Sequence, residues 1–461
     1  MKKVYAADLV LAGGEFLAGR GLVVGADGRV EALLPIDECA GFETVRLAGK
    51  AILPGFANAH SHTFQRLIRG RSENRGTNGD DFWSWREAMY RAALSLDAED
   101  VYHVARMAFL EMALAGTTTV GEFHYLHRGQ DGRAYPDPNL LSKQIVAAAE
   151  SVGIRIALLR VAYLRAGFEL PPHAGQSRFY ETADEFLENT SALAFWLEGK
   201  DKGRAWLGVA PHSIRAVPLD AMKKIVAWAA ERGLPLHLHA AEQVAELRAC
   251  EREYGATPVA LLAREGLLSA KTVLVHAIHI TDAEMDALAA ADSVICSCPT
   301  TERNLGDGIL NAAEVARRGI RVAFGSDSET LIDPLEDARE IEYHLRLQIQ
   351  KRVILDDIGG LNLEQRLLQY ATTGGAQALG FDGGALEGER PADFFTVDLK
   401  DPSIAGNCEQ DLLAAIVFGM SRTAIRDVFV GGEHICNNGR HKLQDEIVKQ
   451  YQSVYRKVWQ A

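Results

Sequence analysis

Long apolar runs are absent from this sequence. Nowhere in its 461 residues do about eighteen apolar residues follow one another without interruption, so no transmembrane helix is expected. Near the N-terminus, Lys2 and Lys3 precede an apolar segment that Asp8 soon interrupts, which does not match a secretory signal. These two observations predict a cytoplasmic protein.

Cysteines are also few. The chain has six, the only close pair is Cys296 and Cys298, and no Cys-x-x-Cys motif occurs. A density this low disfavours a disulfide scaffold and fits a reducing compartment. We expect Cys296 and Cys298 to be small buried residues and not metal ligands.

Basic residues are outnumbered by acidic ones. Lys and Arg total 49 against 62 Asp and Glu, which gives a formal net charge of -13. A general nucleic-acid or anionic-membrane binder needs a basic surface, so neither partner is expected. A small anionic substrate is still allowed, because a few buried arginines can override the overall field locally.

What is present is an ordinary folded composition, with 48% hydrophobic and 24% charged residues. Residues 1–52 read as short strands with glycine-rich turns, and residues 386–445 repeat this texture. We predict a small β-sandwich domain built from both of these segments. A larger domain of residues 53–385 is inserted between them, and residues 446–461 form a C-terminal helix.

The larger domain alternates short β-branched runs with longer stretches rich in Ala, Leu and Glu. This alternation indicates parallel βα units. Eight strands are predicted, at residues 51–57, 117–122, 155–161, 206–210, 234–238, 272–275, 293–297 and 321–325. The expected fold is therefore α/β, a (β/α)8 TIM-type barrel, whose active site lies at the carboxyl ends of the strands.

Polar residues gather where these predicted strands end. His60 and His62 are two residues apart, so in an extended strand they share one face and can reach one metal ion. The ends of strands five, six and eight add His239, His276 and Asp327. Each residue has an ordinary structural explanation alone, such as a surface histidine or a helix cap. Their coincidence at one end of a barrel predicts a divalent metal site.

This arrangement resembles the amidohydrolase superfamily, which carries His-x-His on strand one, His on strands five and six, and Asp on strand eight. The likeness covers residues from about 53 to 330 and extends to the flanking β domain. It implies these metal ligands: His60, His62, His239 and Asp327. It also implies that His276 stabilises the attacking hydroxide or the tetrahedral oxygen.

The resemblance also bears on the number of metals. Members with two metals bridge them with a carboxylated Lys or a Glu at the end of strand four, where this chain has Ala210, Pro211 and His212. One divalent ion per chain is therefore expected. Zn²⁺ is the first candidate, although iron or another divalent ion would serve as well.

Deaminase members of the superfamily carry a Glu three residues after the strand-five His, and Glu242 holds that place here. Zinc lowers the pKa of bound water to near neutrality. Asp327 would accept the water's proton, and Glu242 would protonate the departing nitrogen so that ammonia leaves. The expected reaction is a hydrolytic deamination.

Loops at the catalytic end supply further polar residues. The candidates for substrate binding are Gln65, Arg86, Tyr125, His212 and Arg215. Two guanidinium groups suit a substrate with carboxylates, because each can bind a carboxylate through two hydrogen bonds. Arg86 could instead form a surface ion pair with Glu87.

Three runs around these residues, at 60–66, 82–86 and 210–215, are similar to those of superfamily members of histidine degradation. The resemblance implies hydrolysis of N-formimidoyl-L-glutamate, a dicarboxylate amidine, to N-formyl-L-glutamate and ammonia. It implies that the five loop residues hold the glutamate portion, and a homodimer fits it too.

Two other interpretations remain. A guanine or related purine deaminase of the same superfamily would need a planar slot and donors for ring carbonyls, whereas paired arginines favour a dicarboxylate. A catalytically inactive barrel acting as an assembly protein is disfavoured by the complete set of metal and proton-transfer residues.

Overall fold

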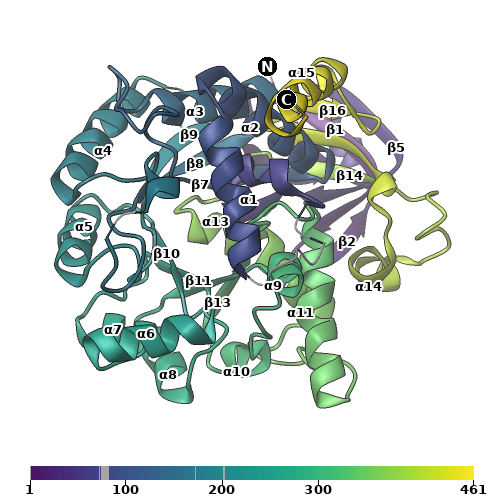
Figure 1. The fold of residues 1–461 in the computed structure, drawn as a ribbon. Coiled ribbons are helices and arrows are strands. Elements are labelled where there is room, and N and C mark those ends of the chain that lie inside the picture. The colour runs from purple at the N-terminus through teal and green to yellow at the C-terminus, as the bar shows by residue number, and fades with distance from the viewer. Residues whose placement is uncertain (1, 72, 74–81, 172, 201–202, 461) are drawn as a thin grey trace.

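A computed structural model describes residues 2–71, 73, 82–171, 173–200 and 203–460 (Figure 1). Eight parallel strands form a nearly closed barrel, arranged in chain order from β6 to β13. They are β6 (Phe56–Ser61), β7 (Thr117–His124), β8 (Arg155–Ala162), β9 (Ala205–Pro211), β10 (Leu236–Ala240), β11 (Thr272–His276), β12 (Val294–Ser297) and β13 (Arg321–Phe324). These strands are buried almost throughout, as expected for a parallel sheet covered by helices. The predicted barrel is confirmed.

The barrel closes between its first and last strands. The N–H of Asp327 donates to the C=O of His60, and the N–H of His62 donates to the C=O of Asp327, both at 3.0 Å. Ser61 and Asp327 thus form a parallel bridge. The segment that follows β13 is therefore fixed beside the end of β6.

The predicted first barrel strand, residues 51–57, was wrong in its placement. Its first residues belong to β5 (Glu43–Pro54) of the other sheet, and the chain passes into β6 at Gly55. A Cβ at Gly55 would lie 2.3 Å from Oγ1 of Thr118, so only glycine allows this close approach. The apolar run continues across Gly55, so the sequence alone does not show where the chain passes from one sheet to the other. Because the barrel strand begins only at Phe56, His60 lies within β6 and not beyond its end.

Helices connect the barrel strands and ring them on the outside (Figure 1). Between β6 and β9 they are α1 (Phe82–Ser95), α2 (Ala98–Leu114), α3 (Leu140–Val152) and α4 (Ala183–Glu198). Between β9 and β12 they are α5 (Leu219–Glu231), α6 (Val244–Tyr254), α7 (Pro258–Arg264) and α8 (Asp282–Ala290). The remainder are α9 (Pro299–Leu305), α10 (Ala312–Arg317), α11 (Pro334–Ile349), α12 (Leu363–Gln369) and α13 (Gly375–Ala378).

Several of these helices begin where the sequence supplies a cap. The hydroxyl of Thr182 accepts from the N–H of Glu185 at the start of α4, and the Glu185 carboxylate accepts from the N–H of Thr182. Such reciprocal capping satisfies backbone donors that have no partner within the helix.

Five shorter helical turns are η1 (Ile36–Cys39), η2 (Thr63–Ile68), η3 (Ala174–Gln176), η4 (Tyr370–Gly374) and η5 (Arg422–Ala424).

A second, nine-stranded sheet combines both ends of the chain. Its strands are β1 (Lys3–Ala12), β2 (Glu15–Ala18), β3 (Arg20–Val24), β4 (Val30–Pro35), β5 (Glu43–Pro54), β14 (Phe394–Asp398), β15 (Ile425–Val430), β16 (Glu433–Asn437) and β17 (Arg440–His441). The antiparallel pair β5–β14 joins the N-terminal strands to the C-terminal ones. The expected β domain from both termini is confirmed. Two further helices are α14 (Glu409–Gly419) and α15 (Gln444–Trp459).

The barrel and this sheet share one packed boundary. The rings of Phe56 and Phe395 lie 4.7 Å apart between their centroids. The guanidinium of Arg155 donates two hydrogen bonds to Asp393, at 2.6 and 2.9 Å, and both side chains are buried. A bidentate pair of this kind fixes orientation as well as distance. No helix of the described residues is long and apolar enough to cross a membrane.

Candidate metal centre and active site

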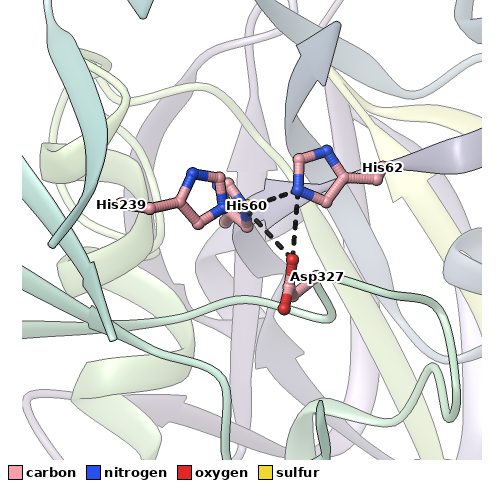
Figure 2. Close-up of side chains that lie close together, drawn as sticks. All are labelled: His60, His62, His239 and Asp327. Atoms are coloured by element: carbon pink, nitrogen blue, oxygen red, sulfur yellow. Dashed lines mark hydrogen bonds and ion pairs between the residues drawn. The ribbon is translucent and has the colours of Figure 1, made fainter. Parts of the chain in front are cut away.

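Four buried side chains converge where the barrel closes (Figure 2). They are His60 and His62 of β6, His239 of β10, and Asp327 just after β13, and their ligand atoms all lie within 4.8 Å of one another. Oδ1 of Asp327 is 3.3 Å from Nε2 of His60 and 3.1 Å from Nε2 of His62. The structure thus brings together all four residues that the sequence suggested as metal ligands.

The hydrogen bonds of the imidazoles suit a cation at the centre. Nδ1 of His62 lies 3.0 Å from the C=O of Phe123, to which it donates. Nδ1 of His239 donates in the same way to the C=O of His212, at 3.1 Å. Each of these rings therefore turns the lone pair of its Nε2 toward the centre. Burial lowers the pKa of His60 to about 3 and holds that of His239 well below its usual range. Neutral imidazoles with one carboxylate fit a divalent ion.

The backbone around the centre is strained. Asp327 has a φ of 50° and His276 a φ of 72°, both in the left-handed region that side chains other than glycine rarely adopt. The two backbone hydrogen bonds that close the barrel hold Asp327 in this conformation. Strain of this kind is tolerated where it aims a functional side chain.

His276, at the end of β11, faces the same carboxylate. Its Nε2 lies 3.8 Å from Oδ2 of Asp327, and its Nδ1 lies 3.3 Å from Oε1 of Glu302. Burial alone would lower the pKa of His276, but Glu242, Glu302 and Asp327 outweigh it and hold that pKa well above its usual range. The surrounding carboxylates therefore favour the protonated form of His276, which can face developing negative charge.

Glu302 and Cys298 lie beside His276, and the ligand atoms of these three residues also fall within 4.8 Å of one another. Glu302 already accepts from the N–H of Cys298 at 2.7 Å and from Ser297 Oγ at 3.2 Å. Burial holds the pKa of the Cys298 thiol well above its usual range, which makes it a poor ligand. Cys296 and Cys298 are both buried free thiols.

Glu242 lies just beyond the end of β10, three residues after His239, and is 7% exposed. It lines the same cavity as His239, His276 and Asp327. Its backbone N–H donates to Oε2 of Glu246 at 3.1 Å. Glu242 thus lies at the edge of the metal centre and lines the cavity that a substrate would occupy.

All five suggested substrate-binding residues line this one cavity, namely Gln65, Arg86, Tyr125, His212 and Arg215. Gln65 Nε2 donates to the hydroxyl of Tyr125 at 2.8 Å. Nδ1 of His212 lies 3.1 Å from Oγ of Ser213. The structure therefore assembles in one cavity side chains from the segments that follow three barrel strands, β6, β7 and β9, with Arg86 on helix α1 and not on a loop.

The two arginines differ in how they are held. Nε of Arg86 donates to the hydroxyl of Tyr90, and its Nη2 donates to the C=O of Ala166 at 3.3 Å. Nε of Arg215 is buried and has no hydrogen-bond partner among the residues that the structure describes. A buried donor without a partner costs free energy, and an anionic substrate bound in the cavity could offset that cost at Arg215. The side chains of Phe82, Trp83 and Ser84 lie outside the described part of the chain.

Sequence reasoning missed several residues at this site. Tyr163 lines the cavity and follows β8 directly, so the rule that strand ends carry function could have found it. Gln176 joins Tyr90 to Tyr163, and Glu302 orients His276. Nothing local in the sequence points to Gln176 or Glu302, because their partners are distant along the chain.

Comparisons with known proteins agree with this geometry. Residues 51–435 match the model of the Amidohydrolase family. The chain is 38% identical over 432 residues to formimidoylglutamate deiminase of Pseudomonas aeruginosa, covering 94% of each protein. It is 27% identical over 424 residues to 5-methylthioadenosine/S-adenosylhomocysteine deaminase of Natronomonas pharaonis, covering 91% of this chain and 89% of that one.

Solved structures show the same architecture. A crystal structure of an amidohydrolase from Brucella melitensis superposes with a TM-score of 0.91 at 34% identity, over 99% of both chains. An adenosine deaminase from Xanthomonas campestris with bound zinc superposes with a TM-score of 0.85 at 22% identity, over 100% of this chain and 99% of that one. With the match to the family model and the buried histidine and aspartate cluster, these likenesses establish that the chain belongs to the amidohydrolase family.

Proposed function

We propose that this protein hydrolyses N-formimidoyl-L-glutamate to N-formyl-L-glutamate and ammonia, a step of histidine degradation in the cytoplasm. The observation that carries the proposal is the buried Arg215, whose Nε has no partner among the described residues and which shares a cavity with Arg86 and the metal centre. The deiminase of that substrate from Pseudomonas aeruginosa is 38% identical over 94% of the chain. The amidohydrolase family and that relative both support a hydrolase acting on C–N bonds.

The metal would be held by His60, His62, His239 and Asp327, and we propose one Zn²⁺ per chain. When bound, a divalent ion lowers the pKa of a coordinated water and so supplies a nucleophile at neutral pH. β9 ends in Ala210 and Pro211, followed by His212, so neither Lys nor Glu stands there to bridge a second ion. Elemental analysis should find about one zinc per active chain, and two tightly held ions would contradict this assignment.

The residues around the centre then divide the proton transfers. As the oxygen of the attacking water bonds to the amidine carbon, Asp327 accepts a proton from that water. His276, a cation 3.8 Å from Asp327 Oδ2, faces the negative charge that develops on that oxygen. Glu242, starting protonated, gives its proton to the imino nitrogen, and the proton held by Asp327 then passes to the same nitrogen. The remaining proton of the former water returns to Glu242 as the C=O bond forms and the C–N bond breaks, so ammonia leaves the formamide product.

The remaining residues select the substrate. Arg86 and Arg215 bind the two carboxylates, and Gln65, Tyr125 and His212 supply further polar contacts along the glutamate portion. Burial would lower the pKa of Arg215, but nearby groups including Tyr163 and Glu242 raise it, so the guanidinium stays charged. A fixed cation of this kind recognises an acidic substrate and leaves a neutral purine with an unmatched charge. We further propose that the protein acts as a homodimer.

An ammonia-release assay tests the proposal. The purified protein, with its metal content measured, is given N-formimidoyl-L-glutamate, an uncharged N-formimidoyl alkylamine, guanine and S-adenosylhomocysteine. We expect kcat/KM for the dicarboxylate to exceed the others by roughly a hundredfold or more, since the alkylamine and guanine lack both carboxylates and S-adenosylhomocysteine has only one. Faster turnover of either purine compound would assign the cavity to a purine deaminase. Metal-loaded protein that releases no ammonia from any of them would favour an inactive barrel.

A further inference from the structure

A chain of hydrogen bonds lies behind the substrate cavity. Gln176 is 2% exposed, and its Nε2 lies 2.9 Å from the hydroxyl oxygen of Tyr90 and 2.9 Å from that of Tyr163. The hydroxyl of Tyr90 also accepts from Nε of Arg86. One buried amide thus connects the tyrosine that holds Arg86 to a second tyrosine in the cavity wall.

Nε2 of Gln176 is the atom that faces both hydroxyls, and its Oε1 is buried without a hydrogen-bond partner among the described residues. An amide NH₂ group can only donate, so the hydroxyl oxygens of Tyr90 and Tyr163 both accept from Gln176. The hydrogen of each hydroxyl must then point to a different acceptor. Within the described ranges, the hydroxyl of Tyr163 makes no hydrogen bond as a donor, and its side chain lines the substrate cavity.

Tyr163 stands among the residues suggested for substrate binding. Its ring centroid is 4.6 Å from that of His212 and 6.4 Å from that of Tyr125. It is 5% exposed, so water does not readily satisfy its hydroxyl hydrogen. Arg215, whose Nε also awaits an acceptor, lines the same cavity.

We propose that Tyr163 is a further carboxylate-binding residue of this cavity, and that Gln176 is a positioning residue that directs the Tyr163 hydroxyl hydrogen toward the substrate. The inference rests on the proposed function and adds a neutral donor beside Arg215. A carboxylate oxygen placed between Tyr163 and Arg215 would satisfy two buried donors at once.

The first experiment removes the hydroxyl with Tyr163→Phe. Because a hydrogen bond to a charged group is lost, kcat/KM for N-formimidoyl-L-glutamate should fall by about 10-fold to 100-fold, mostly through KM. The fall for an uncharged N-formimidoyl alkylamine should be at least about tenfold smaller, since that compound lacks the carboxylate. The matched control is Tyr343→Phe on α11, outside the cavity, which should behave as the parent. Equal losses on both substrates, or no loss, would overturn the role of Tyr163.

The second experiment tests Gln176 with Gln176→Met in the parent and in the Tyr163→Phe background. In the parent, kcat/KM for the dicarboxylate should fall by about threefold to tenfold, because the hydroxyl is no longer directed. In the Tyr163→Phe background the further fall should be clearly smaller, since Gln176 acts through that hydroxyl. The same fall in both backgrounds would show that Gln176 acts elsewhere. Metal content serves as the folding control.

Failure of the proposed function would be recognised separately. If the parent releases no ammonia from N-formimidoyl-L-glutamate, the proposed function is wrong. Calorimetric binding of glutarate, a dicarboxylate without the reactive group, then decides the inference by itself. We expect Tyr163→Phe to weaken glutarate binding by about tenfold or more, and unchanged binding would refute the carboxylate contact.

Discussion

Arg160 and Arg215 are two buried arginines with opposite surroundings. Arg160, on β8, is 0% exposed and donates two hydrogen bonds to Glu181, at 2.7 and 2.9 Å, and a third to Asn139 at 3.0 Å. Arg215 lies beyond β9, and no described residue accepts a hydrogen bond from its Nε. Both lie near the carboxyl end of the barrel. Arg160 is fully hydrogen-bonded to its neighbours, whereas Arg215 has Glu242 and Glu246 near enough to raise its pKa but, among the described residues, no acceptor for its Nε.

The difference separates groups that stabilise the fold from groups that serve a ligand. A buried guanidinium costs free energy unless its hydrogen bonds and charge are matched. Around Arg160 the chain supplies the matching groups, including Asn189, which donates to Glu181 at 2.6 Å. Around Arg215 that cost is left for a bound anion to offset. The metal centre follows the same rule, because the ligand atoms of four buried side chains converge there.

The largest effect is expected from His239→Ala, which removes one of the four proposed metal ligands. An incomplete shell should release the metal, and activity should be lost with it. Elemental analysis and the ammonia-release assay measure both quantities. His344→Ala on α11, remote from the centre, is the control and should retain metal and activity. An active, metal-loaded His239→Ala variant would remove this residue from the ligand set.

Glu242→Gln tests proton transfer without changing the metal shell. Glutamine keeps the size of the side chain but cannot exchange a proton, so turnover should fall by roughly a hundredfold to ten-thousandfold. Metal content should be retained, because Glu242 lies outside the four ligands. Glu251→Gln, exposed on helix α6 that follows Glu242, should have no effect. Loss of metal would move Glu242 into the shell, and near-normal turnover would exclude it from the mechanism.

Arg215→Met and Arg86→Met test the proposed carboxylate contacts directly. Removing one partner of a desolvated charge pair costs about 2 to 5 kcal/mol, which is roughly 30-fold to a few thousand-fold in kcat/KM for N-formimidoyl-L-glutamate. Metal content should stay normal, and an uncharged formimidoyl amine should be almost indifferent to either change. Unchanged kinetics in both variants would refute the carboxylate contacts.

The part of the site that the sequence predicted is the part encoded locally. His60 and His62 share a face because strands alternate every two residues, and strand ends are recognisable without tertiary information. The passage from one sheet to the other at Gly55 was missed, because it depends on the approach of Thr118 from a distant strand. Gln176 was missed for the same reason, since its partners lie 86 and 13 residues away.

Arg160→Met should lower stability and preserve activity, which is the reverse of what we expect for Arg215→Met. It leaves Glu181 buried without its main partner, so the free energy of unfolding should fall by about 3 to 5 kcal/mol. Metal-loaded protein that remains folded should still hydrolyse the substrate, because Arg160 does not line the cavity. Denaturant unfolding of both variants measures the contrast. A double variant, Arg160→Met with Glu181→Leu, should be more stable than Arg160→Met alone, since no charge is then stranded. Equal stability of Arg160→Met and Arg215→Met would contradict the distinction between an arginine that stabilises the fold and one that binds substrate.

The smallest expected effect is a pH dependence of stability that belongs to Glu181. Burial would raise the pKa of its carboxyl, but the charges of His127 and Arg160 and the hydrogen bonds from Arg160 and Asn189 lower it to about 2 from an ordinary 4.5. His127 itself has a pKa lowered to about 4 by burial, so at neutral pH Arg160 supplies the matching charge.

A carboxyl with a depressed pKa contributes stability that is complete above pH 4.5 and is lost as the pH falls toward 2. The full contribution is about 3 kcal/mol, and urea unfolding should show the difference in stability between the parent and Glu181→Gln narrowing as the pH falls from about 5 toward 2. Glu188→Gln, exposed on helix α4 that follows Glu181, should follow the parent at every pH. A constant difference between the parent and Glu181→Gln over this range would mean that the carboxyl is not held ionised by Arg160, and the contrast with Arg215 would then rest on hydrogen bonding alone.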